Sequence, residues 1–328
     1  MDDRIRGQEI AVARLKAASQ SGRVAHAYLF TGPAGVGKHT TARAFAAALL
    51  CAAAREGVAC GECLPCRLFR AANHPDFHGL APEGKTVGIE KIRQVILALG
   101  QKPHYRRHVV VIDQAEKVTV EAQNAFLKTL EEPPGGAVVI LVTAQPKALL
   151  PTIRSRCSEI KFRRLRPDIV EEELVRMHGV PLEEAKILAV LSGGSIGRAL
   201  ELRRPEMLAL RERVLRCAVK PVLGEVQGTP VHNKAEAEEW LTFFSLWYRD
   251  LLLYQFMGDP GLLVNADRLR EIEEARISPA RLVAAVETVE VAKRMLRANV
   301  NPRLVVEGLV VRLGLILRSQ EPEARSQN

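Results

Sequence analysis

Short runs of apolar residues alternate with longer amphipathic stretches through the first half of the chain. Continuous apolar runs predict strands buried on both faces, and helical spacing of apolar residues predicts amphipathic helices. The strands are expected over residues 28–31, 77–80, 108–113, 137–143 and 158–162. The helices are expected over residues 8–19, 40–50, 89–99 and 119–132, with Thr119 as the N-cap of the last. This alternation predicts an α/β fold with a parallel sheet between two layers of helices.

After Pro167 the pattern becomes helical throughout. Helices are expected over residues 168–177, 182–191, 206–218, 234–257, 262–275, 278–298 and 302–318. A loop is expected over residues 221–230, and the polar tail after Arg318 is expected to be disordered. We therefore predict three domains: an α/β domain over 1–165, a small helical domain over 166–204 and an all-helical domain over 205–328.

A glycine loop joins the first predicted strand to the next helix. It reads Gly32-Pro33-Ala34-Gly35-Val36-Gly37-Lys38. In this context the loop N–H groups and the helix N-terminus hold phosphates, and the lysine reaches the β- and γ-phosphates. His39 stands where a Ser or Thr normally binds Mg²⁺, and imidazole is a poor ligand for that hard cation. Thr40 comes one residue late, roughly 100° further round the helix. The loop therefore predicts binding of ATP or ADP without efficient hydrolysis.

The acidic half of such a site shows a second defect. Asp113 ends a buried strand, where a P-loop ATPase places the carboxylate on the Mg²⁺ side. The next residue is Gln114, and an amide cannot accept a proton as a general base. Gln can orient water in some GTPases, and Glu116 lies nearby, although its side chain is expected to point in another direction. Two defects at coupled positions indicate a site with absent or weak ATPase activity.

Four of the six cysteines lie close together in the sequence: Cys51, Cys60, Cys63 and Cys66. Four thiolates at these spacings are typical of a tetrahedral structural Zn²⁺ site, which has no open position for a substrate. A redox Cys-x₂-Cys pair and four unrelated thiols are the other interpretations. Cys157 and Cys217 are isolated, and we expect ordinary buried residues there.

Charge and hydropathy limit the class of protein. The net charge of +9 and the pI of 9.4 fit work near nucleic acid, but they also fit a protein with solvated basic faces. No apolar run approaches the roughly 20 residues that span a bilayer. The start of the chain, Met1-Asp2-Asp3-Arg4, has no apolar signal-peptide segment. We expect a cytoplasmic protein that does not contact membranes.

Several segments in this order resemble the clamp-loader family of bacterial DNA polymerase III. They are residues 26–30, the glycine loop, the four cysteines, residues 124–134 and Pro151-Thr152-Ile153-Arg154-Ser155-Arg156-Cys157. The resemblance is strong over the first 200 or so residues and weaker over residues 299–313. It implies an AAA+ module, a helical lid and a helical collar, corresponding to the three predicted domains.

The resemblance also implies partners and roles. Such subunits form a hetero-pentamer of gamma/tau, delta and delta-prime subunits that loads a sliding clamp onto primed DNA. Arg156 would be an arginine finger that reaches the ATP site of a neighbouring gamma or tau subunit. Arg198 matches the sensor arginine of the lid, and Thr143 falls at the first sensor position.

The defects at His39 and Gln114, together with the retained Arg156, favour the delta-prime group. The resemblance implies that such a subunit supplies its arginine to a neighbour's ATP site and does not hydrolyse ATP at its own site. Two alternatives stay open: an active gamma-like ATPase in which Thr40 or a water replaces the missing ligand, and a zinc-bearing DNA-binding protein with a vestigial P-loop.

Overall fold

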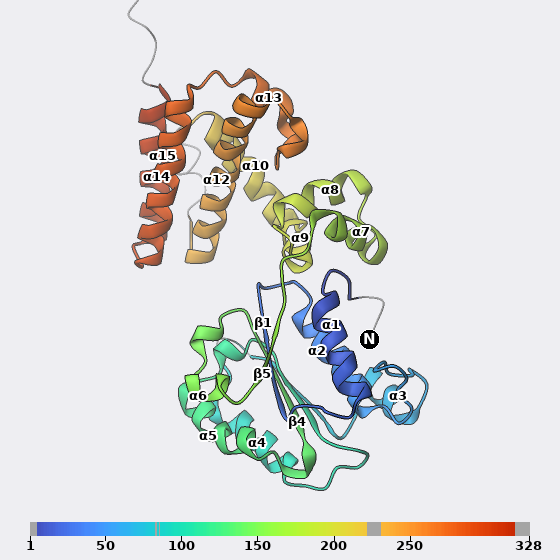
Figure 1. Cartoon of the computed structure of the whole chain (residues 1–328). Helices are drawn as coiled ribbons and strands as arrows, with labels where there is room; N and C mark the ends of the chain where they lie inside the picture. The colour runs from blue at the N-terminus through green and yellow to red at the C-terminus, as the bar shows by residue number, and fades with distance from the viewer. Residues whose placement is uncertain (1–4, 83, 85, 222–230, 319–328) are drawn as a thin grey trace, which may run out of the picture. The chain divides into compact units, whose positions relative to one another are not determined.

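The computed structural model describes residues 5–82, 84, 86–221 and 231–318 (Figure 1). The predicted loop beyond Pro221 and the predicted tail after Arg318 lie outside these residues. The chain divides into two compact units. The first comprises residues 1–185 and 192–198, and the second comprises residues 186–191 and 199–328. The boundary passes through the predicted lid, and the limits of the three domains stay predictions.

The first unit contains a five-stranded parallel sheet. Its strands are β1 (Ala27–Thr31), β2 (Phe77–Leu80), β3 (Val109–Ile112), β4 (Val138–Thr143) and β5 (Ser158–Lys161). They are hydrogen-bonded in the order β2-β3-β4-β1-β5, with each neighbouring pair parallel. β1, β3 and β4 are buried at every position, as continuous apolar runs predict. All five predicted strands are confirmed.

Helices cover both faces of this sheet (Figure 1). On one face lie α1 (Glu9–Gln20) and α2 (Lys38–Leu50), whose Leu15 and Phe45 join the core with Tyr28 and Phe30. On the other face lie α4 (Ile89–Leu99), α5 (Val120–Glu131) and α6 (Pro151–Arg154). Thr119 caps α5 as predicted, because its side chain accepts a hydrogen bond from the Ala122 N–H. The predicted α/β fold is confirmed.

Three further helices follow β5 along the chain. They are α7 (Pro167–His178), α8 (Leu182–Leu191) and α9 (Ile196–Leu202). Gly193 and Gly194 take left-handed backbone angles between α8 and α9, which agrees with the predicted helix stop. An additional short helix, α3 (Leu64–Arg70), follows the third clustered cysteine.

The second unit is helical. Its principal helices are α10 (Pro205–Val219), α12 (Lys234–Met257), α13 (Leu269–Glu274), α14 (Pro279–Arg297) and α15 (Pro302–Arg318). Aromatic residues of α12 lie in the core of this second unit, and Trp240, Phe244 and Trp247 are each at most 1% exposed. Within the described residues, no helix has the length and apolar character needed to cross a membrane.

The predicted helix over residues 262–275 is wrong in its first half. Leu263 to Asn265 do not form a helix, and α13 begins only at Leu269. The reason is a buried polar network. The backbone N–H and side-chain amide of Asn265 both donate to Asp250 of α12, at 2.7 and 2.9 Å. Arg211 of α10 donates to the Asn265 side-chain oxygen at 2.8 Å, so tertiary hydrogen bonds override the helical pattern.

Candidate functional site

The glycine loop lies between β1 and α2, at the edge of the sheet where the parallel strands end. Gly32 and Gly35 have positive φ angles of 144° and 70°. A methyl group on Gly32 would overlap the carbonyl oxygen of Phe162, and one on Gly35 would overlap the Ser195 hydroxyl. Glycine is needed at both positions because the backbone angle and the close neighbours exclude a side chain.

The lysine of the loop is turned back onto the loop itself. Lys38 is 6% exposed, and its Nζ donates to the carbonyl oxygens of Gly32 and Pro33, at 2.7 and 2.5 Å. Burial lowers the pKa of Lys38, while the nearby carboxylates of Glu116 and Asp113 oppose that shift. At least two of the three ammonium donors are therefore engaged by the loop in this arrangement.

The start of α9 lies against the same loop. The Gly197 N–H donates to the carbonyl oxygen of Gly35 at 3.2 Å, and the Ser195 hydroxyl accepts from the Arg198 N–H at 3.1 Å. The sequence motif around Arg198 is thus brought to the glycine loop, over 160 residues away in the chain. The start of α9 thus contacts the loop at Gly35.

The first turn of α2 carries three polar residues after the lysine. His39 and Thr40 are exposed, whereas Thr41 is buried and donates its hydroxyl hydrogen to the Gly37 carbonyl at 2.9 Å. His39 and Thr40 are thus open to solvent, and the buried hydroxyl of Thr41 is already bonded to the backbone.

The acidic side of the site contains a residue that sequence reasoning did not assign to it. Gln114 is exposed with a left-handed φ of 48°, and the following 3₁₀ turn turns Glu116 toward the site. The Glu116 Oε1 accepts from the Ala144 N–H at 3.4 Å, next to the buried Thr143 at the end of β4. Glu116 affects the pKa of Lys38 more strongly than Asp113 does. Its Oε2 is buried without a hydrogen-bond partner in the described part of the chain.

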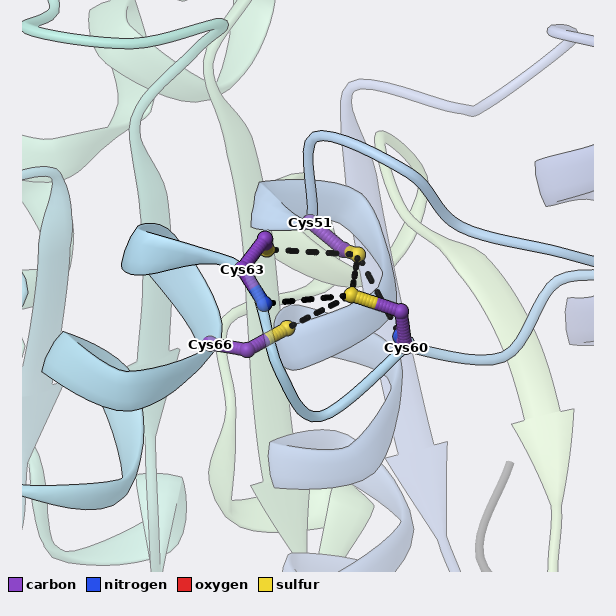
Figure 2. Close-up of side chains that lie close together, drawn as sticks. All are labelled: Cys51, Cys60, Cys63 and Cys66. Carbon is purple, nitrogen blue, oxygen red and sulfur yellow. Dashed lines mark hydrogen bonds between the residues drawn. The ribbon is translucent and has the colours of Figure 1, made fainter.

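The four clustered cysteines converge at the far end of α2 (Figure 2). Their sulfur atoms all lie within 4.8 Å of one another. The separations are 3.5 Å for Cys51–Cys60, 3.8 Å for Cys51–Cys63 and 4.0 Å for Cys60–Cys66. Four sulfurs placed tetrahedrally at the Zn–S distance of about 2.3 Å would be about 3.8 Å apart, so this set fits zinc.

Helices and backbone amides hold this cluster. Cys51 follows the last turn of α2, Cys63 precedes α3 and Cys66 lies within α3. The Cys60 N–H donates to the Cys51 sulfur at 3.3 Å, and the Cys63 N–H donates to the Cys60 sulfur at 3.4 Å. α2 has 13 residues, so at 1.5 Å per residue its length of roughly 20 Å separates the cluster from the glycine loop. A metal there would stabilise the local structure and would be too far away to contact a nucleotide at the glycine loop.

The remaining cysteines are separate from the cluster. None of the six cysteines, all of which the structure describes, forms a disulfide. Cys217 is fully buried, in line with the sequence prediction, and Cys157 is mostly shielded, where burial raises its pKa to about 12.

Arg156 follows the short helix α6 and lies partly exposed. Its Nε donates to Glu131 Oε1 at 2.7 Å, and its Nη2 forms an ion pair with the same oxygen. Its Nη1 donates to the Thr152 carbonyl at 2.9 Å. Sequence reasoning did not identify Glu131 as a contact of Arg156, because the two residues lie 25 positions apart.

Comparisons with known proteins agree with this architecture. The family described as DNA polymerase III, delta subunit, matches residues 7–166, and its C-terminal family matches residues 206–314. The DNA polymerase III subunit delta' of Pseudomonas aeruginosa is 34% identical over 303 residues, which cover 88% of this chain and 91% of that protein. The delta' subunit of Bacillus subtilis is 30% identical over 312 residues, covering 89% and 91%.

A longer relative and a solved structure complete the comparison. The gamma/tau subunit of Mycobacterium tuberculosis is 30% identical over 363 residues, which cover 98% of this chain and 62% of that subunit. A gamma subunit-related protein of Thermotoga maritima has a TM-score of 0.50 at 19% identity, covering 93% of this chain and 99% of its own. That last likeness concerns the fold.

A five-stranded parallel sheet with a glycine loop after β1 defines a P-loop-type α/β module. The two matches to delta' subunits, at 34% and 30% identity over 88% and 89% of this chain, specify the family. The chain belongs to the DNA polymerase III delta-prime family of clamp-loader subunits.

Proposed function

We propose that this chain is a clamp-loader subunit that lends Arg156 to the ATP site of a neighbouring subunit and does not hydrolyse ATP itself. One combination carries this proposal: His39 and Gln114 replace the residues of hydrolysis, while Arg156 keeps a partly exposed guanidinium. A guanidinium supplied from a neighbour offsets the charge that develops on a transferring phosphoryl group.

The chain's own loop retains the groups for holding a nucleotide. Gly32 to Lys38 would bind phosphates through backbone N–H groups and Lys38, with Arg198, Asp113 and Thr143 around them. To reach a phosphate, the Lys38 ammonium would have to leave the Gly32 and Pro33 carbonyls to which it donates. His39 stands where the usual Ser or Thr would be, so Mg²⁺ would lack its usual side-chain hydroxyl ligand.

The proposed partners are gamma/tau and delta subunits in a hetero-pentamer, the sliding clamp, and primed DNA through the complex. The names of the relatives support membership of this machine. The helical unit would supply subunit contacts. Leu304, Val311 and Leu315 lie at helical spacing on α15 and are 62%, 44% and 70% exposed, which offers apolar surface for a neighbour.

The test is ATP hydrolysis by a complex reconstituted with gamma/tau and delta subunits. We compare the native chain with Arg156→Ala and with Arg154→Ala, a matched control two residues away. We expect no turnover by the isolated chain, lower turnover by the Arg156→Ala complex and unchanged turnover by the Arg154→Ala complex. Removal of an arginine finger costs about 10³–10⁵ in kcat at a site that depends on it alone. ATP sites that receive their arginine from other subunits would account for the activity that remains in the Arg156→Ala complex.

Two outcomes would replace this proposal. Turnover by the isolated chain, abolished by Lys38→Ala and accompanied by an Arg156→Ala complex of native activity, would establish an active gamma-like ATPase. Failure to join the complex, with tight and strongly salt-dependent DNA binding by the chain alone, would indicate a zinc-bearing DNA-binding protein.

We also propose that Cys51, Cys60, Cys63 and Cys66 hold a structural Zn²⁺. When bound, the ion would link the end of α2 to α3 and the loop between them. We expect one zinc per chain by elemental mass spectrometry, retained in Cys157→Ser and lost in Cys60→Ser. Equal zinc content in the two variants would contradict this assignment.

A further inference from the structure

The side chain of Arg156 is held by two neighbouring elements. Glu131 is the last residue of α5, and Thr152 lies in α6. The Nε and Nη2 of Arg156 both contact Glu131 Oε1, and Nη1 donates to the Thr152 carbonyl. The guanidinium is thus fixed at all three nitrogens by its own chain.

These contacts leave part of the guanidinium available. A guanidinium carries five N–H groups, and the observed contacts use three of them, one on each nitrogen. One N–H remains on each terminal nitrogen. Two such N–H groups can bind a phosphate in the bidentate way that distinguishes arginine from lysine. The internal contacts therefore leave N–H donors of Arg156 for a phosphoryl group.

The ion pair between Arg156 and Glu131 contributes little to folding. The two side chains are 35% and 47% exposed, and water screens the attraction in pairs exposed to this extent. Its effect lies in orientation, because a free arginine side chain samples many rotamers and loses that freedom only when a phosphate binds. A carboxylate that fixes Nε and Nη2 beforehand removes much of this entropic cost.

We infer that Glu131 is a positioning residue that orients Arg156 toward the γ-phosphate of the nucleotide bound by the neighbouring subunit. This inference rests on the proposed role of Arg156. It assigns to Glu131 a function carried only through Arg156, with no contact between Glu131 and the nucleotide. The Thr152 carbonyl is the second support of the same guanidinium.

The test uses the same reconstituted complex with Glu131→Ala, Glu131→Gln and Glu132→Ala. Glu132 is the exposed carboxylate next in the chain and serves as the matched control. For the turnover that depends on Arg156, we expect Glu131→Ala to lower kcat by about 3- to 30-fold at unchanged KM for ATP. Glu131→Gln should lose less, because its amide oxygen still accepts from Nε. Glu132→Ala should match the native complex, and all three variants should melt at the native temperature.

A double variant separates the possible results. Arg156→Ala combined with Glu131→Ala should lose no more turnover than Arg156→Ala alone, because Glu131 acts only through Arg156. If Arg156→Ala lowers turnover and Glu131→Ala does not, the positioning role is overturned while the arginine-lending function stands. A larger loss in the double variant, or a rise in KM, would also overturn it. If Arg156→Ala has no effect, the proposed function itself fails.

Discussion

A methyl group on Gly35 should loosen the contact between the glycine loop and the start of α9. Gly35 has a φ of 70°, and its added Cβ would overlap the Ser195 hydroxyl and lie 3.0 Å from the Gly197 Cα. The hydroxyl can rotate, but the Gly197 backbone has to shift. Gly37→Ala is a matched control, since its φ is 93° and no described heavy atom lies within 4 Å of the added Cβ.

The expected magnitude follows from this difference. Both variants place an L-residue in the left-handed region, which costs about 1–2 kcal/mol. Only Gly35→Ala adds overpacking, which costs about 1–3 kcal/mol more. The Gly197 N–H donates to the Gly35 carbonyl, so its rate of hydrogen exchange reports opening of this contact. At 1.4 kcal/mol for each factor of ten, exchange should be about 5- to 150-fold faster in Gly35→Ala than in Gly37→Ala.

The assay is hydrogen–deuterium exchange with mass spectrometry on peptides that contain Gly197. Adding Ser195→Ala to Gly35→Ala should slow exchange again, because the overlapping hydroxyl is gone, although the hydrogen bond to the Arg198 N–H is also lost. Equal exchange rates in Gly35→Ala and Gly37→Ala would refute the reasoning, since they would mean that α9 does not press on the loop at Gly35.

Three further predictions concern stability. Burial lowers the pKa of His74 and His78, so below about pH 6.5 the unfolded chain binds more protons than the folded chain does. The urea concentration at the unfolding midpoint should therefore be lower at pH 5.5 than at pH 7.5. An unchanged midpoint would contradict this. Asp250→Ala leaves two buried donors of Asn265 without an acceptor and should lower the free energy of unfolding by about 2–5 kcal/mol. The measurement is urea unfolding followed by the fluorescence of the α12 tryptophans. A decrease below about 1 kcal/mol would count against the network. Thr119→Ala should cost about 1 kcal/mol through loss of the α5 N-cap, measured by circular dichroism, with Thr119→Ser retaining most of the stability.

The sequence by itself determined most of the elements and the identity of the candidate sites. Apolar runs identified β1, β3 and β4, because strands buried on both faces need apolar side chains at every position. The glycine loop and the cysteine cluster were also readable, since their spacing over a few residues specifies the chemistry. The family resemblance rested on the same short segments, and the matches to delta' subunits confirm it.

Only the tertiary structure decided how these parts meet. It turned Lys38 onto the loop carbonyls, brought Gly197 to Gly35 and directed Glu116 toward the lysine. It also paired Arg156 with Glu131 and replaced the start of a predicted helix with hydrogen bonds to Asp250. Most of these contacts join residues far apart in the chain. Local periodicity reports which face of an element is buried, but it carries no information about which distant polar groups will satisfy one another there.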